Sequence, residues 1–309
     1  MAVHHLLSLM DLTKQEIEAL FELTALLKKK KVRVSAPLAG KTLGLVFQKP
    51  SVRTRLSFEI GMYQLGGQCV YLGPEDIQQG QREAAKDVAR VLSRYVDGIA
   101  ARTFAHQNVG ELAQWATVPV INGLSDTHHP CQALADLFTI RERFGQLKSP
   151  KIAYFGDGNN VCHSLMHGCA LLGANLTVAT PSHHQPQPAI IAEARLAAKR
   201  SGGRITLTTN PKDAAKGASV LYTDVWVSMG QSRTKAQLKA FAPFQLNRQL
   251  VALADKRYLA MHCLPAHRGE EITDDVLDSP HSVVFDQAEN RLHIQKAVLL
   301  WLLRGARTR

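Results

Sequence analysis

The stretch Lys49-Pro50-Ser51-Val52-Arg53-Thr54-Arg55 lies where a predicted strand ends and a predicted helix begins. The apolar run at 43–47 before it is typical of a buried strand. Pro50 prevents a helix from continuing upstream and Ser51 is a favourable N-cap, so we expect a helix to begin here. After it, apolar residues recur at helical spacing, at Leu56, Ile60 and Tyr63.

The first turn of this helix carries two arginines and two hydroxyl residues. It also offers unpaired backbone N–H groups and the positive end of the helix dipole. Because arginine binds phosphate oxygens with two parallel hydrogen bonds, the pattern indicates a pocket for a small phosphorylated substrate. The alternative is a solvated helix start with surface arginines.

The composition is that of an ordinary globular protein. The chain has 309 residues, 45% of them hydrophobic and 20% charged, which suggests two domains of about 150 residues. No apolar run reaches the ~18 residues of a membrane span, and the N-terminus does not resemble a signal peptide. The five cysteines are scattered without a CxxC pair, which favours reduced thiols. We therefore expect a cytoplasmic protein.

The chain is basic, with 37 Lys and Arg against 26 Asp and Glu and a formal charge of +11. This favours anionic ligands. No zinc-finger spacing or aromatic-basic RNA motif accompanies the charge, so we expect no nucleic-acid partner.

Strands and helices alternate along the whole chain, which predicts an α/β protein. The interpretation is two similar-sized α/β/α domains, each with a mainly parallel sheet, at 1–148 and 149–309. The segment Lys148-Ser149-Pro150 is the expected hinge, and Asp76-Ile77-Gln78-Gln79-Gly80 is an expected loop. The predicted strands are 43–47, 68–72, 98–102, 119–122, 151–155, 176–179, 204–208, 220–223 and 258–261.

Polar residues follow several of these strands, and in parallel sheets the carboxyl ends of the strands face the ligand crevice. Arg102, Asn160, Asp224 and the pair His262-Cys263 are the candidates. A carboxylate near the hydroxyl and glycine of Ser228-Met229-Gly230 suits an amine ligand. The alternatives are a surface arginine at 102 and a helix-capping carboxylate at 224.

Three other patterns are weaker. His128-His129-Pro130-Cys131 contains zinc-type ligands, but their spacing does not place a pair on one helix face. Gly156-Asp157-Gly158-Asn159-Asn160 begins like a dinucleotide-binding loop, yet Val161 replaces the third glycine. Cys263 beside His262 lacks a third orienting group for nucleophilic catalysis. We therefore expect no metal and no cofactor.

Taken together, these motifs resemble the aspartate/ornithine carbamoyltransferase family over nearly the whole chain, and its ornithine-specific branch most closely. Residues 51–55 resemble the family's Ser-Thr-Arg-Thr-Arg motif, and His129-Pro130-Cys131-Gln132 resembles His-Pro-x-Gln. Asp224 with Ser228-Met229-Gly230, and His262-Cys263-Leu264-Pro265, are similar to the ornithine signatures. Val52 departs from the usual Thr, which removes a hydroxyl but keeps a backbone N–H.

The resemblance implies transfer of a carbamoyl group from carbamoyl phosphate to the δ-amine of L-ornithine, giving citrulline for arginine biosynthesis. It implies an active site in the interdomain cleft, a C-terminal helix at about 288–305 that packs back on the first domain, and a homotrimer. The implied catalytic residues are Arg102, His129, Gln132, Asp224 and Cys263. The implied carbamoyl phosphate ligands are Ser51, Val52, Arg53, Thr54, Gln78, Arg102, His129, Gln132, Cys263, Leu264 and Arg291. The implied ornithine ligands are Asn160, Asp224, Ser228 and Met229.

Two alternatives stay open at the level of sequence. The first is a carbamoyltransferase for another amine, such as putrescine or an acylated ornithine. The second is a binding or regulatory protein that keeps the fold without turnover.

Overall fold

The chain folds into two compact units. The computed structural model describes residues 3–29, 36–77, 83–228, 230 and 232–304. The first unit consists of residues 1–134 with 289–309, and the second of 135–288. Both contain a parallel sheet covered by helices, which confirms the predicted fold class. The predicted domain boundary at 148/149 stays a prediction.

In its described residues, the first unit has a four-stranded sheet in the order β2-β1-β3-β4. All neighbouring strands are parallel. The strands are β1 (Thr42–Phe47), β2 (Gln68–Leu72), β3 (Gly98–Arg102) and β4 (Val120–Leu124). The other elements of this unit are the 3-10 turn η1 (Leu9–Asp11), α1 (Lys14–Lys28), α2 (Val52–Gln64), α3 (Pro74–Ile77), α4 (Ala85–Tyr95) and α5 (His106–Trp115). The predicted loop is thus helical at its start, since α3 includes Asp76 and Ile77, and its remainder, residues 78–80, lies outside the described residues.

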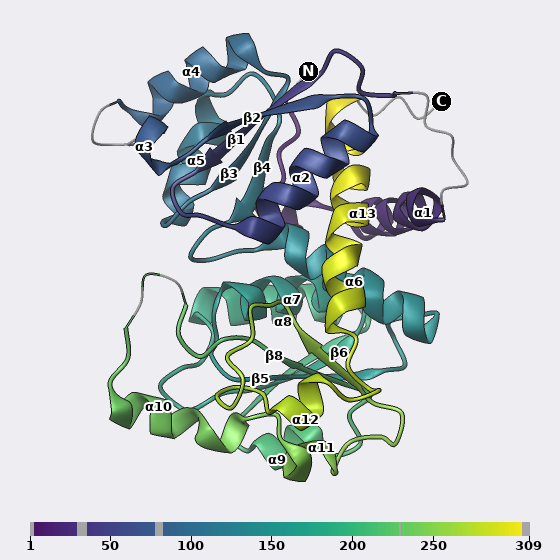
Figure 1. The fold of residues 1–309 in the computed structure, drawn as a ribbon. Coiled ribbons are helices and arrows are strands. Elements are labelled where there is room, and N and C mark those ends of the chain that lie inside the picture. The colour runs from purple at the N-terminus through teal and green to yellow at the C-terminus, as the bar shows by residue number, and fades with distance from the viewer. Residues whose placement is uncertain (1–2, 30–35, 78–82, 229, 231, 305–309) are drawn as a thin grey trace. The chain divides into compact units, whose positions relative to one another are not determined.

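Helices α4 and α5 cover one face of this sheet, where Val88, Ala89, Val109 and Leu112 enter a buried core. On the other face, α2 lies beside α13 (Val284–Leu303), as Figure 1 shows. The Lys296 ammonium donates to Oε1 of Gln64 at 2.8 Å, joining these two helices. This contact places the C-terminal helix against the helix that begins at Ser51.

The apolar stripe that indicated α2 does not enter the core. Leu56, Ile60 and Tyr63 are 51%, 41% and 78% exposed. The buried face of the helix carries small or polar residues together with Phe58 and Met62. The helix was therefore predicted correctly, but the apolar side chains that indicated it lie on the surface of the single chain.

In its described residues, the second unit has a five-stranded parallel sheet in the order β7-β6-β5-β8-β9. The strands are β5 (Lys151–Phe155), β6 (Asn175–Ala179), β7 (Arg204–Thr208), β8 (Val220–Thr223) and β9 (Leu259–His262). The helices are α7 (Asn160–Leu172), α8 (Pro188–Ser201), α9 (Pro211–Ala215), α10 (Lys235–Phe241), η2 (Ala242–Phe244), α11 (Arg248–Val251) and α12 (Asp274–Leu277). Residues of α9, α11 and α12 enter one core with β5, β8 and β9, and α7 packs against α8 (Figure 1). Helix α6 (Pro130–Phe144) contains the division between the units after Leu134.

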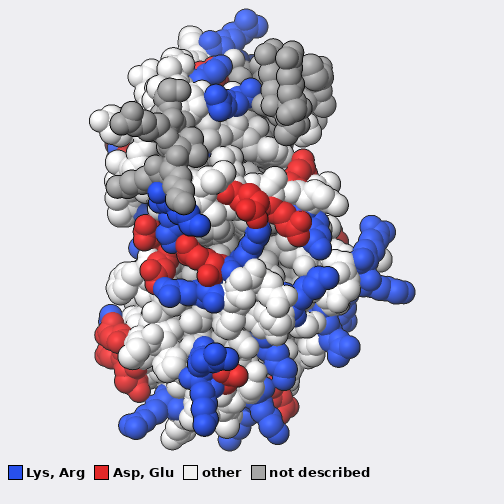
Figure 2. All heavy atoms as spheres, turned by 90° about the vertical axis from the view of Figure 1, so that its right-hand side faces the viewer, with Lys and Arg blue, Asp and Glu red and all other residues white. Residues whose placement is uncertain are grey.

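None of the helices in the described residues is long and apolar enough to cross a membrane. On the face drawn in Figure 2, the Lys and Arg side chains among the described residues lie between acidic and uncharged ones. They form no continuous basic strip there of the kind that tracks a nucleic-acid backbone.

Candidate active site

The start of α2 supplies the first group of site residues. Ser51 has extended backbone angles and caps the helix, because its hydroxyl accepts from the Thr54 N–H at 3.3 Å. Arg291 of α13 donates from Nη2 to Oγ1 of the buried Thr54 at 2.8 Å. Arg53 is half-buried, whereas Val52 is 72% exposed. The helix start thus carries one arginine, Arg53, and is contacted by a second, Arg291 of α13.

The second arginine of the motif points elsewhere. Nε of Arg55 lies 2.9 Å from Oε1 of Glu59, and its guanidinium lies 3.9 Å from the centre of the Tyr71 ring. Its side chain remains substantially exposed. Of the two arginines in the motif, Arg53 is therefore the one available to an anion bound at the helix start.

Arg102, His129 and Gln132 are all buried in the same unit. Arg102 ends β3, and the other two lie at the start of α6. Burial holds the pKa of His129 well below its usual value, and the positive charges of Arg291, Arg102, Lys49 and Arg53 lower it further. The imidazole is therefore neutral at neutral pH and has one N–H to donate.

This arrangement gathers cations around a neutral hydrogen-bond donor. The positive charges of Arg53, Arg102 and Arg291 all act on His129, so these three side chains lie near it in the first unit. A doubly charged anion would offset two of these three positive charges. Cys131 is buried in the interior with its Sγ 3.8 Å from the carbonyl oxygen of Asn122, and burial raises its thiol pKa to about 12.

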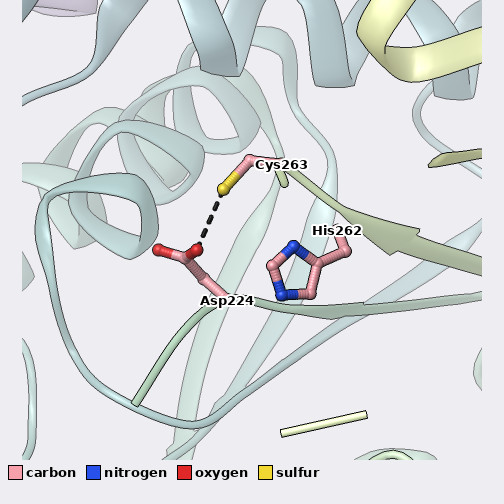
Figure 3. Close-up of side chains that lie close together, drawn as sticks. All are labelled: Asp224, His262 and Cys263. Atoms are coloured by element: carbon pink, nitrogen blue, oxygen red, sulfur yellow. Dashed lines mark hydrogen bonds between the residues drawn. The ribbon is translucent and has the colours of Figure 1, made fainter. Parts of the chain in front are cut away.

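A carboxylate and a thiol form the second group of site residues, in the other unit. Asp224 follows β8 and Cys263 follows β9, two neighbouring strands of the sheet. The Cys263 side chain points at the Asp224 carboxylate, with Sγ 2.9 Å from Oδ1 (Figure 3). Asn159 donates from Nδ2 to the other carboxylate oxygen at 2.8 Å. Both carboxylate oxygens of Asp224 are thus held by neutral donors.

His262 supports the backbone of this group. Its Nδ1 accepts from the Leu264 N–H at 2.8 Å, so Nε2 carries the proton and donates to Oε1 of Glu271 at 3.0 Å. Both side chains are fully buried. Leu264 has a φ of +57°, a left-handed conformation that costs energy for a branched residue. The histidine therefore holds in place the strained residue that follows Cys263.

Asp224, His262 and Cys263 are also the best-placed metal ligands in this group. Their ligand atoms lie within 4.8 Å of one another. Both nitrogens of His262 are engaged with Glu271 and Leu264, however, so this residue would have to break a hydrogen bond to bind a metal. The cluster as it stands is a hydrogen-bonded network.

The remaining predicted residues are placed as follows. Asn160, buried, is the first residue of α7, and Ser228 is half-buried after Asp224. Gln78 and Met229 lie outside the described residues. The predicted residues thus fall into two groups, each within its own compact unit, and their assignment as substrate ligands remains a prediction.

Three residues of these groups were missed from sequence. Asn159 was quoted only as part of a loop, Lys49 only as the start of the motif, and Glu271 not at all. A signal existed for Asn159, because Asn just before a helix is a strong N-cap, and its side chain does accept from the backbone of residues 161 and 162.

The fold and these two groups define a class of protein: a parallel α/β protein of two units, with a buried cationic group in one unit and a carboxylate–thiol pair in the other. Comparison with known proteins narrows this class. Residues 4–142 match the aspartate/ornithine carbamoyltransferase carbamoyl-P binding domain, and residues 148–302 match the Asp/Orn binding domain of the same family. The chain belongs to the aspartate/ornithine carbamoyltransferase family.

Individual relatives match over their full length. The ornithine carbamoyltransferase of Thermococcus kodakarensis is 54% identical, with 99% of this chain and 98% of the relative covered. The anabolic ornithine carbamoyltransferase of Pyrococcus furiosus is 53% identical over the same shares. A solved structure of ornithine carbamoyltransferase from Pyrococcus furiosus has a TM-score of 0.96 and covers 99% of each chain at 53% identity.

Proposed function

We propose that this chain transfers the carbamoyl group of carbamoyl phosphate to the δ-amine of L-ornithine, giving L-citrulline and phosphate in arginine biosynthesis. The observation that carries the proposal is the set of arginines around the neutral, buried His129. Relatives support the proposal as well. Two proteins named ornithine carbamoyltransferase are 54% and 53% identical to this chain over nearly their whole length.

The first unit binds carbamoyl phosphate in this proposal. Arg53 and the backbone N–H groups of the α2 start hold the phosphate, with Ser51, Val52, Thr54, Gln78 and Arg291 alongside. Arg102 and His129 donate to the carbamoyl oxygen, where negative charge develops during the reaction. Gln132 accepts from the carbamoyl NH₂. A neutral imidazole suits this role because it donates a hydrogen bond without giving up a proton.

The second unit binds ornithine. The negatively charged Asp224 attracts the amino acid's cationic groups, and Asn160, Ser228 and Met229 hold its amino and carboxylate end. Cys263 and the Leu264 carbonyl lie toward the reacting amine and the carbamoyl group.

The transfer itself needs no dedicated base. The neutral δ-amine attacks the carbamoyl carbon, the new C–N bond forms, and the C–O bond to phosphate breaks. The amine proton leaves with the phosphate. Holding both substrates in attack geometry can recover about 7–11 kcal/mol of the barrier.

Two arginines of the same helix turn provide a matched test. Arg53→Ala should raise the KM for carbamoyl phosphate at least about tenfold, because a charged hydrogen-bond donor is lost. Arg55→Ala should change it less than about twofold, because Arg55 binds Glu59 and Tyr71 at the surface. Citrulline formation is measured with ornithine, putrescine and an acylated ornithine. An unchanged KM in Arg53→Ala would contradict the phosphate role, and preference for another amine would change the assigned acceptor.

We also propose a homotrimer. The exposed apolar side chains of α2, Leu56, Ile60 and Tyr63, face solvent in the single chain. Val70 is exposed on β2, which is an edge strand. Such surfaces mark contacts with other chains. Light scattering should give three times the chain mass of 34.0 kDa, and a monomer would contradict this proposal.

The cytoplasm is the proposed location. All five cysteines are free thiols, as a reducing compartment keeps them. The test is fractionation of the native host. Recovery of this protein outside the cytoplasm would contradict the proposed location.

A further inference from the structure

Arg233 is a buried arginine that belongs to neither group of site residues. It lies in the second unit, in the segment between β8 and α10, and its side chain is 9% exposed. Nη2 lies 2.8 Å from Oδ2 of Asp157, whose side chain is 11% exposed, so the two form a buried ion pair. The guanidinium also lies 4.7 Å from the centre of the Phe241 ring. Removing either member of such a pair leaves the other charge uncompensated in the interior.

The His184 ring completes the surroundings of the guanidinium. Its Nδ1 lies 2.6 Å from Nη1 of Arg233. Because a guanidinium can only donate, Nδ1 accepts and carries no proton. Burial lowers the pKa of His184 and the charge of Arg233 lowers it further, which agrees with a neutral ring. Arg233 thus binds a carboxylate and a ring nitrogen at once, as the planar fork of donors on an arginine allows.

The partners of Arg233 come from loops that follow different strands of one sheet. Asp157 follows β5 and His184 follows β6, whereas Arg233 itself belongs to the segment after β8. The first two loops are also joined by their backbones, since the Gly158 N–H donates to the His184 carbonyl at 2.8 Å. The carboxyl ends of parallel strands meet at one edge of a sheet, where α/β proteins bind their ligands. Arg233 therefore joins three loops at that edge.

Hydrogen bonds connect Asp157 to the carboxylate of the second group of site residues. The Asn159 backbone N–H donates to the Asp157 carbonyl at 2.8 Å, and Nδ2 of the same asparagine donates to Oδ2 of Asp224 at 2.8 Å. Burial raises the pKa of Asp157, Arg233 opposes that rise, and the charge of Asp224 adds to it. Arg233 therefore offsets the repulsion between these two carboxylates.

A second connection runs through two aromatic rings. The Phe241 ring beside the guanidinium stacks on Trp226, with the ring centres 5.6 Å apart and the planes at 24°. Both rings are buried. Trp226 lies in the chain between Asp224 and Ser228, which are both predicted ornithine ligands. Packing that fixes the Trp226 ring thus also restrains the backbone that carries these two residues.

We propose that Arg233 is a positioning residue for the amino-acid acceptor, because it holds the loops after β5, β6 and β8 in the arrangement that binds ornithine. The inference rests on the proposed function of the second unit. Arg233 acts through Asp157, Asn159 and Trp226 rather than by touching the substrate. Without it, only a fraction of the molecules has the loops arranged for binding, and the apparent affinity falls by that fraction.

Steady-state kinetics of citrulline formation with the full chain test the inference. Arg233→Gln should raise the KM for ornithine about tenfold, as expected if about a tenth of the molecules keep the binding arrangement. Bound ornithine restores that arrangement, so kcat should change less than about threefold, and the KM for carbamoyl phosphate less than about twofold. Arg233→Lys keeps the charge without the planar fork and should give an intermediate KM for ornithine.

Arg143→Gln is the matched control. Arg143 also forms an ion pair within the second unit, with Nη2 2.6 Å from Oδ2 of Asp286, but both side chains are substantially exposed. A surface pair of this kind contributes little, so the variant should keep the kcat and both KM values of wild type.

Asp157→Asn tests the ion pair from the other side and should also raise the KM for ornithine. The double variant with Arg233→Gln removes both charges, so neither is left unpaired in the interior. Its KM should be no higher than that of either single variant. If the two single effects multiply in the double variant, the residues act independently and the inference is overturned.

Two further results would overturn it. One is an Arg233→Gln protein whose KM for ornithine stays within about twofold of wild type. The other is an equal rise in the KM values of both substrates, which a general loss of structure would produce.

Hydrogen exchange separates failure of this inference from failure of the proposed function. Amide exchange over residues 224–228 should be at least about fivefold faster in Arg233→Gln, whichever amine is the acceptor. If wild type forms no citrulline but exchange is faster in the variant, the acceptor is wrongly assigned and the positioning role stands. Unchanged exchange would overturn the positioning role itself.

Discussion

The Cys263 thiol donates its hydrogen bond to the Asp224 carboxylate, with 2.9 Å between Sγ and Oδ1. The negative charge of that carboxylate opposes formation of a thiolate beside it. A nucleophilic cysteine is usually activated by a histidine or a cation beside it, and both ring nitrogens of the neighbouring His262 bind other groups. The geometry therefore favours direct transfer between the substrates over a carbamoyl-cysteine intermediate.

Cys263→Ser tests this. Serine keeps a donor to Asp224 with a shorter bond, so we expect kcat to fall by about tenfold, and Cys263→Ala to lose more. Mass spectrometry of the wild-type protein quenched during turnover should show the unmodified chain mass. A carbamoyl adduct on Cys263 that accumulates and decays with turnover would overturn direct transfer.

Glu271 should act as a positioning residue for the same loop. It accepts from Nε2 of His262, whose Nδ1 accepts from Leu264. Glu271→Ala leaves a buried N–H without an acceptor, which costs about 1–3 kcal/mol of stability, and it should lower kcat with little change in the KM for carbamoyl phosphate. Glu271→Gln keeps an acceptor oxygen and should recover most of both. Urea unfolding and steady-state kinetics measure the two effects; equal losses in Ala and Gln variants would contradict an acceptor role.

The fold was readable from sequence because buried parallel strands are short apolar runs between helices. The strands predicted at 43–47 and 151–155 are examples, because each is followed by a polar loop and then a helix. Periodicity alone failed for the face of α2. It identifies an apolar stripe but not whether the stripe meets the chain's own core or another surface, and Tyr63 proved exposed.

The site was predictable where residues follow strands and where motifs resemble a known family. Arg102 and Asp224 are of this kind. Glu271 was not predictable, because its role depends on a hydrogen bond to a buried ring nine residues earlier, in a loop without periodicity. Lys49 was not predicted for another reason. The sequence before a proline suggests a surface lysine, and only the packing of the folded chain shows that Lys49 is buried.

Gly158 explains why the loop after β5 resembles a dinucleotide-binding loop. A Cβ at this position would lie 2.2 Å from the Pro186 backbone nitrogen and 2.4 Å from the Gln185 carbonyl carbon. The glycine therefore allows another backbone segment to approach closely, and no cofactor is needed to account for it. Gly158→Ala should destabilise the protein by about 1–3 kcal/mol and reduce activity, because the adjacent Asn159 holds Asp224.

Gly110→Ala is the matched control for that change. It lies within α5, and a Cβ there meets no atom within 4 Å. Alanine should stabilise the helix by about 0.5–1 kcal/mol. Thermal unfolding of both variants distinguishes the close backbone approach at Gly158 from a general effect of replacing a glycine. A Gly158→Ala protein as stable as the Gly110→Ala protein would contradict the packing argument.

The last prediction concerns acid stability and His167. This residue is buried within α7, and burial lowers its pKa to about 4, with a smaller contribution from His163. Glu193 lies 3.3 Å from Nε2, but its carboxylate is exposed and screened by water, so burial dominates. The unfolded chain, with an ordinary histidine pKa of about 6.5, therefore binds more protons than the folded chain between pH 6.5 and pH 4.

The free energy of unfolding must then fall as the pH drops from 6.5 toward 4. Above pH 6.5 the contribution of the neutral His167 to stability is fully present. The shift corresponds to at most about 3 kcal/mol at pH 4. His129 contributes in the same direction, so the measurement is the difference between wild type and His167→Gln in urea unfolding at pH 7 and pH 5. The variant should lose less stability on acidification, even if it is less stable at pH 7. Equal losses in the two proteins would mean that His167 takes up no proton on unfolding, and the acid sensitivity would have to come from other groups.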